Sequence, residues 1–164
     1  HVLDFICDNV KTYAMAGMEP HEFETLMDID IDTHHGEESI AVDTITKLGD
    51  SMPALGIVAC VMGVVITMGA INEPPEVLGH HVAVALVGTF LGVLMCYGFI
   101  GPMATLMEHY VKEEAAYYQV IRIALVSFVA RSTPQIAIEF ARRAIPESER
   151  PGFEELEKIL KGKK

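Results

Sequence analysis

Two long stretches without charged side chains most constrain how this chain can fold. Residues 51–72 contain no Asp, Glu, Lys or Arg over 22 positions, and residues 77–107 contain none over 31. Each stretch exceeds the roughly 18 apolar residues that indicate a transmembrane helix. A helix of the first length is about 33 Å long at ~1.5 Å per residue, close to the ~30 Å hydrocarbon core of a bilayer. The pattern predicts an integral membrane protein.

The segment between the two runs predicts how they are connected. Its sequence, NEPPEVLGHH (residues 72–81), contains two prolines and a glycine, which suits a short connection between antiparallel helices. We therefore expect an all-α membrane protein, with a transmembrane helical hairpin whose long helices extend into a cytoplasmic helical domain. The expected regions are cytoplasmic helices over 1–49, the hairpin over 50–107 with spans at about 51–72 and 82–106, and cytoplasmic helices over 108–164.

The distribution of charge predicts the orientation of the hairpin. Residues 1–50 contain twelve acidic residues and two lysines, whereas residues 108–164 contain ten of the twelve Lys and Arg residues. The loop between the spans contains neither Lys nor Arg. Because positively charged flanks stay in the cytoplasm, we expect both ends of the chain on the cytoplasmic side, with Glu73 and Glu76 outside.

Several helices are expected outside the membrane. A helix should begin at Pro20, with acidic residues in its first turn, and can run on into the first span. Residues 117–130 are apolar but contain Arg122 and are too short to cross a bilayer, so they predict a separate, buried cytoplasmic helix. Residues 132–143 should form a helix with a Ser or Thr cap before Pro134, and residues 148–160 a short amphipathic helix.

Other kinds of site find little support. Asp28, Asp30 and Asp32 have the spacing of a calcium loop, but Thr33 occupies the position that needs glycine and Ser39 the position of the bidentate Glu. No metal site, enzymatic motif or basic run for nucleic acid is apparent, and the net charge of −11 opposes nucleic-acid binding. We expect no cofactor. The three cysteines are odd in number and suit buried thiols better than disulfides.

Small residues on both spans predict close helix packing. Gly88 and Gly92 form a GxxxG pair, and Gly56, Cys60 and Gly63 place small side chains on one face of the first span. Two interpretations remain open. The small residues can serve packing within the hairpin, or packing against further helices of an oligomer.

Three residues of the spans suggest a mobile or polar pathway. Pro53 and Pro102 would each free a backbone carbonyl and act as a hinge if their helices continue past them, although Pro53 equally suits a helix start. Thr89 can donate a hydrogen bond to the Ala85 carbonyl or face a polar path. Because the spans contain no carboxylate, Lys or Arg, an ion crossing here needs an acid from another subunit.

Four motifs together resemble a known family. They are GDSMPALGIVACVMGVV (residues 49–65), VALVGTFLGVLMCYGFIGPMA (84–104), PQIAIEFARR (134–143) and SERPGFEELE (148–157). In this order they are similar to the MotA family of flagellar stator proteins, and the LMD…TH segment at residues 26–34 fits the same family. The wider family includes the ExbB and TolQ energisers.

The resemblance implies a function and partners. It implies the last two of four spans, in a homo-pentamer of MotA copies that surrounds two MotB helices in the bacterial inner membrane. An Asp on MotB would carry the ion, and the cytoplasmic part would push on the rotor protein FliG. Pro53 and Pro102 match the family's functional prolines, Thr89 matches the threonine of the ion path, and Tyr97 lies in a matching motif, where we expect it to pack.

Some expectations stay open within the resemblance. Sodium-driven members carry a second threonine where this chain has Cys60, so we expect coupling to protons. The charged residues that engage the rotor would lie upstream of His1, and a chain without an initiator Met suggests a fragment or a processed protein. Two alternatives to an ion-conducting stator subunit remain: a proton-driven energiser of the ExbB/TolQ type, and a passive membrane scaffold.

Overall fold

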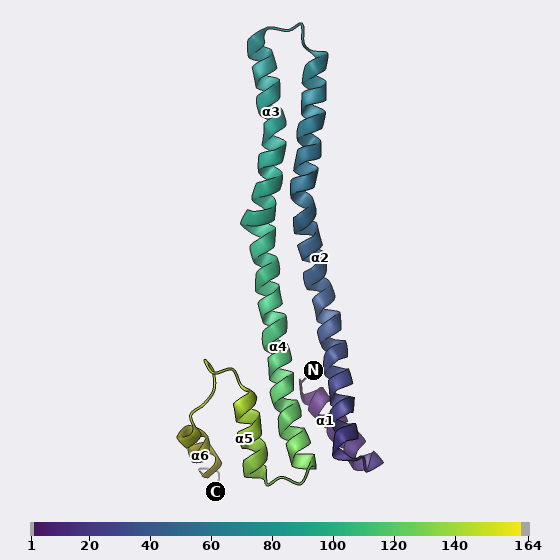
Figure 1. Ribbon diagram of the computed structural model, residues 1–164, viewed down its shortest axis with the longest axis vertical. Helices are drawn as coiled ribbons and strands as arrows, with labels where there is room; N and C mark the ends of the chain where they lie inside the picture. Colours follow the sequence, from purple (N-terminus) through teal and green to yellow (C-terminus); the bar gives the residue numbers. More distant parts are fainter. Residues whose placement is uncertain (1, 162–164) are drawn as a thin grey trace. The chain divides into compact units, whose positions relative to one another are not determined.

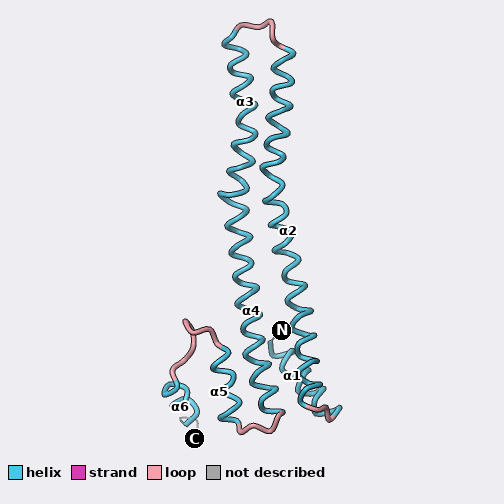
Figure 2. The backbone as a smooth tube through the Cα atoms, in the orientation of Figure 1, coloured by secondary structure: helices cyan, strands magenta, loops and turns pink. Residues whose placement is uncertain are grey.

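The structure is a computed structural model that describes residues 2–161, and this part of the chain is helical, without strands. The helices are α1 (Val2–Ala16), α2 (Pro20–Gly69), α3 (Pro75–Leu94), α4 (Gly101–Val129), α5 (Pro134–Ala144) and α6 (Phe153–Lys161), with a π-helical turn η1 (Met95–Ile100) between α3 and α4. Figures 1 and 2 show their order along the chain. The predicted all-helical class with a membrane hairpin is confirmed.

The described residues divide into two compact units, which are treated separately below. One comprises residues 37–110, and the other comprises the segments before and after it, up to 36 and from 111. In the unit of residues 37–110, α2 and α3 lie antiparallel and are joined by a short turn after Gly69 (Figure 1). The helix after the turn begins at Pro75, with proline at the first helical position, so the connection is shorter than residues 72–81.

Both long helices are apolar enough to cross a membrane. They cover Pro20–Gly69 and the continuous segment Pro75–Val129, and only 11% of the most apolar window of each is buried within the chain. A core helix of a soluble protein would be mostly buried, so this exposed apolar surface fits lipid or neighbouring subunits better. Helix ends do not mark the bilayer surface, and the boundaries expected at 50 and 107 stay predictions.

Several expected helix limits differ from the structure. Pro53 lies inside α2, so the interpretation of a helix start at this proline is wrong. Residues 117–129 of the segment expected at 117–130 are the end of α4 and not a separate helix, because good helix formers connect them to the span. The last helix begins at Phe153, not near Ser148, since Pro151 and Gly152 interrupt a helix before it.

Particular residues mark the end of α1 and the start of α5. α1 ends at Ala16 and is followed by Gly17, whose φ of 62° is the left-handed conformation that glycine adopts easily. Sequence analysis expected helices within residues 1–49 but gave no bounds for this first one. Before α5, Thr133 occupies the N-cap position, as expected, but its side chain makes no capping hydrogen bond. Pro134 follows at the first position, where a missing N–H costs nothing.

Candidate functional site in the helical hairpin

The two spans touch through their backbones. A Cβ atom on Gly56 would lie 2.7 Å from the Gly88 carbonyl oxygen, and one on Gly92 would lie 2.5 Å from the Met52 carbonyl oxygen. Real Cβ atoms do not approach other atoms so closely. These glycines therefore allow α2 and α3 to pack at a distance that larger side chains would prevent.

The same close approach continues toward the turn. A Cβ on Gly63 would lie 2.5 Å from that of Ala85, and Ala85 itself is 6% exposed. The buried hydroxyl of Thr67 donates to the Gly63 carbonyl at 2.8 Å, so this hydroxyl is satisfied within its own helix. The glycines predicted to pack thus do so within one hairpin. Packing against an oligomer's other helices stays a prediction.

Thr89 lies at the centre of the glycine contacts. Its Oγ1 donates to the Gly56 carbonyl of the facing helix at 3.4 Å, and the residue is half-buried. The hydrogen bond to the Ala85 carbonyl in its own helix, one of the two predicted alternatives, is not the one formed. The reason is the glycine at 56, whose missing side chain exposes its carbonyl to α3. Cys60, half-buried and one turn further along α2, is a free thiol.

Tyr97 points away from the helix contact. Its side chain is 72% exposed, whereas Cys96 beside it is 5% exposed. The predicted packing role of Tyr97 is therefore not fulfilled inside the hairpin and would need another chain. Phe99, with 61% of its surface exposed, lies on the outer surface as well.

The two prolines have different helical surroundings. Pro53 is accommodated within an unbroken α-helix, whereas Pro102 follows the π turn η1. There the Gly101 amide bonds to the Cys96 carbonyl, five residues back instead of four. Pro102 has no N–H, so it gives the carbonyls before it no hydrogen bond. A hinge role for both prolines stays a prediction. Sequence analysis missed the π turn.

In the other unit, Arg122 joins α4 to α2. Its Nη2 donates to Glu24 at 2.9 Å and to Asp28 at 2.6 Å, and only 16% of its side chain is exposed. Glu24 and Asp28 lie one turn apart on α2, so one guanidinium neutralises two neighbouring carboxylates. The acidic surface of α2 around Asp28 is therefore partly paired within the chain. Residues 28–33 are helical, which is not the geometry of a calcium loop.

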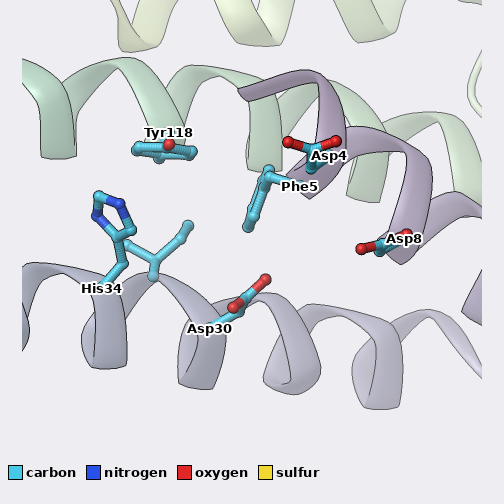
Figure 3. Close-up of a pocket in the computed structure, with 7 residues that line it drawn as sticks. Asp4, Phe5, Asp8, Asp30, His34 and Tyr118 are labelled. Carbon is cyan, nitrogen blue, oxygen red and sulfur yellow. The ribbon is translucent and has the colours of Figure 1, made fainter. Parts of the chain in front are cut away.

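The same unit contains a small acidic cavity of about 190 Å³. Figure 3 shows carboxylates entering it from α1 and α2, with the Tyr118 ring of α4 on its other side. The Tyr118 ring centroid lies 5.1 Å from those of both Phe5 and His34. Asp30 accepts a hydrogen bond of 3.3 Å from Asn9. The aromatic contacts stabilise the packing of these three helices.

A network of arginines holds the end of α5. Arg142 donates two hydrogen bonds of 2.7 Å to Glu139 and one of 3.1 Å to the Pro151 carbonyl. Arg143 donates to Glu139 at 3.0 Å. Hydrogen bonds from Arg142 and then Arg143 lower the pKa of Glu139 to about 2, and the pKa of Arg142 is raised by the same pairing. Arg150 donates to the carbonyls of Arg143 and Ile145, which end the helix.

Comparison with known proteins adds relatives. The model of the MotA/TolQ/ExbB proton channel family matches residues 3–120. Motility protein A of Escherichia coli is 42% identical over 99% of this chain and 55% of its own length. The chemotaxis protein LafT of Vibrio parahaemolyticus is 35% identical over 97% of this chain and 56% of its own length. The chain thus spans about half the length of these curated relatives.

Two solved structures share the fold. One is from the flagellar MotAB stator complex of Bacillus subtilis, with a TM-score of 0.76 and 20% identity over 90% of this chain and 57% of that one. The other is from C. jejuni MotAB, with a TM-score of 0.80 and 14% identity over 92% of this chain and 58% of that one. At these identities the likeness concerns the fold alone.

Proposed function

Because the chain belongs to the MotA/TolQ/ExbB proton channel family, we propose that it is part of a flagellar stator subunit, which couples ion flow across the membrane to rotation of the rotor. The observation that carries the proposal is the composition of the hairpin contact. A threonine hydroxyl and backbone carbonyls lie between closely packed spans without any acidic or basic side chain. This arrangement offers polar groups along a path but no ion carrier of its own.

The missing ion carrier defines the first partner. The solved relatives are complexes named MotAB, and a MotB-type subunit with a membrane Asp would supply the carboxylate that this chain lacks. The exposed apolar side chains of the hairpin support such contacts. Leu55, Val58 and Phe90 are each more than half exposed within the single chain. Lipid and helices of other subunits would cover them.

The assembly and location follow from the same proposal. Five copies would surround two MotB helices in the bacterial inner membrane, with both ends of this chain in the cytoplasm and the cytoplasmic helices acting on FliG. The charge distribution supports this orientation, since ten of the twelve Lys and Arg residues follow the second span. The family is one of proton channels and not an enzyme class.

Protons are the proposed coupling ion. Cys60 lies half-buried in the first span, one turn from the carbonyl that Thr89 contacts. A thiol is a weak acceptor and a poor ligand for sodium, which prefers oxygen. The substitution Cys60→Thr would add a hydroxyl beside that of Thr89, which is the pair of threonines expected in sodium-driven members. Sodium-dependent swimming of the unsubstituted protein would contradict it.

Ion uptake tests the proposal directly. The full-length protein is reconstituted with its MotB-type partner in vesicles, and proton uptake is followed with a pH-sensitive dye after a membrane potential is imposed. We expect uptake to require the partner and to fall at least several-fold in Thr89→Val, which removes the hydroxyl but keeps the shape of the side chain. Thr105→Val is the matched control, because the Thr105 hydroxyl bonds within its own helix to Gly101.

Motility separates the remaining functions. Swimming in soft agar should fall with the same Thr89 variant while the amount of protein in the membrane stays unchanged. A loss of outer-membrane uptake with normal swimming would instead indicate an energiser of the ExbB/TolQ type. Absence of ion uptake with the partner present would favour a passive scaffold.

A further inference from the structure

The π turn η1 adds one residue to the second spanning helix. In an α-helix each amide bonds to the carbonyl four residues back, whereas a π turn bonds five residues back and so contains one residue more. The Gly101 amide follows the longer pattern and bonds to Cys96. The π turn therefore takes up one surplus residue of the sequence at this point of the second spanning helix.

Contacts between the spans show where it is needed. On the α3 side of η1, Gly63 contacts Ala85 and Gly56 contacts Gly92. The two contacts are thus seven residues apart on α2 and also seven residues apart on α3. Across η1 the count changes. The next glycine of α2 that contacts the second helix is Gly49, seven residues before Gly56, and its side-chain partner is Ile100. From Gly92 to Ile100 there are eight residues. The facing helix therefore uses one residue more than α2 over the same length.

The rotation of the helix explains the difference. Ala85, Gly92, Cys96, Ile100 and Ala104 are the buried residues of the second helix in this unit. Ala104 comes 19 positions after Ala85. At about 100° per residue, an α-helix of that length would make five full turns and rotate about 100° further. Ala104 would then face well away from α2. A π turn that takes up one surplus residue absorbs about 100° of this rotation and returns Ala104 to the contact.

Proline alone does not explain the π turn. Pro53 lies between Gly49 and Gly56, where α2 remains α-helical and keeps its seven-residue spacing. A proline can thus be accommodated in this hairpin without a surplus residue. The distinguishing feature of the second span is the contact of Ile100, the last residue of η1, with Gly49.

We propose that η1 is a register element: by taking up one surplus residue in a π turn, it keeps the parts of the second spanning helix before and after it on the same face of α2. If the same residues were all α-helical, packing at Gly88 and Gly92 and packing at Ile100 and Ala104 would be incompatible. The inference concerns residues 37–110 alone and stands independently of ion flow.

Deletion and insertion have opposite predicted effects. Deleting Phe99, an exposed residue of η1, should convert the π turn to α-helix and leave Ile100 facing Gly49. Inserting an alanine between Gly98 and Phe99 adds a second surplus residue, which should turn Ile100 by about 100° away from α2. A regular helix would tolerate neither change, so the asymmetry is specific to the register element.

Disulfide formation provides the readout. A Cβ on Gly49 would lie 3.6 Å from that of Ile100, within the ~3.5–4.5 Å range of disulfides. Gly49→Cys and Ile100→Cys are introduced together into the full-length protein with its three native cysteines replaced, and membranes are treated with an oxidant. A protease site engineered into the turn after Gly69 lets a gel distinguish linked from unlinked halves. We expect cross-linking within about twofold of the parent after the deletion, and at least a tenfold loss after the insertion.

A second pair and a proline variant complete the test. Ala59→Cys with Gly88→Cys reports on the span before η1. Their Cβ atoms would lie 3.1 Å apart, so the helices must separate by a few tenths of an ångström for the disulfide to form, and the pair should then cross-link in both variants. Pro102→Ala should keep the cross-link between positions 49 and 100, whereas its loss would make the proline the cause of the π turn. Equal loss after deletion and insertion, or loss of both cross-links after deletion, would overturn the proposal.

Discussion

At the scale of single residues, ion pairs outside the spans connect and stabilise the helices. Arg122 interrupts an apolar segment of the sequence, and the structure explains it by the paired carboxylates of Glu24 and Asp28 on another helix. Their partner could not be predicted from the sequence because 94 residues separate Asp28 from Arg122. The Glu139–Arg142 pair is different. Its two residues are three positions apart on one helix, and residues at that spacing lie close together in any helix.

The lowered pKa of Glu139 predicts a loss of stability in acid. A carboxyl whose pKa is lower in the folded state stabilises the fold fully above its ordinary value, near 4.5, and loses that contribution as the pH falls toward about 2. Thermal unfolding of the full-length protein in detergent should show a difference in Tm between wild type and Glu139→Gln that shrinks between these pH values. A difference independent of pH would contradict the assignment.

Arg131 predicts a stabilising substitution. Its φ of 63° makes it the only non-glycine residue with positive φ among residues 2–161. The Ser132 amide bonds to Ser127 and the Arg131 amide to Phe128, the hydrogen bonds of a helix end that usually contains glycine here. Relief of the backbone strain, partly offset by the greater freedom of unfolded glycine, should raise the unfolding free energy of Arg131→Gly by up to about 1 kcal/mol.

A neighbouring variant controls for that prediction. Ala130 has no positive φ, so Ala130→Gly adds only chain entropy and should lower stability by roughly 0.5–1 kcal/mol. Chemical unfolding of both purified variants, compared with wild type, measures the difference. Destabilisation by Arg131→Gly equal to that of the control would show that the arginine conformation is not strained.

At the scale of elements, the hairpin depends on spacing more than on hydrophobicity. Apolar residues cover all sides of the spans, so a hydrophobic stripe cannot indicate which side faces the neighbour. The glycines do indicate it, because backbones can approach only where side chains are absent. Sequence analysis therefore found Gly56, Gly88 and Gly92 but not the π turn.

A methyl group at Gly92 tests the close contact. In Gly92→Ala the new Cβ would lie 2.5 Å from the Met52 carbonyl oxygen, so the helices must separate. Overpacking of this kind costs roughly 1–3 kcal/mol. We expect a lower Tm and weaker resistance to SDS in the detergent-solubilised full-length protein.

Gly79→Ala is the matched control for Gly92→Ala. Gly79 lies in the same helix α3 with nothing within 4 Å of a built Cβ, so its substitution should leave Tm within about 2 °C of wild type or raise it slightly. Equal effects at the two positions would show that the contact is not limiting for stability.

At the scale of the whole molecule, the chain leaves much apolar surface without a partner inside itself. Only 11% of the most apolar window of each spanning helix is buried, and Leu55, Phe90 and Phe99 are exposed outside the hairpin contact. Lipid can cover such side chains, but a hydroxyl at the helix contact and an exposed Tyr97 gain most from neighbouring helices. This favours an assembly over an isolated hairpin.

The size of that assembly is the corresponding prediction. Native mass spectrometry of the full-length protein, purified in mild detergent with its MotB-type partner, should give five copies of this subunit with two of the partner. A monomer of the subunit under conditions in which the partner remains bound would contradict the proposed ring.

The sequence by itself determined the spans, the hairpin and the glycine-lined contact. These follow from local properties: freedom from charge over a bilayer's thickness, a proline-containing turn, and small side chains at helical spacing. Only the tertiary structure decided the bond from Thr89 to Gly56, the pairing of Arg122 and the π turn before Pro102. Each depends on what the facing helix presents, so the amino-acid pattern of one helix cannot determine it.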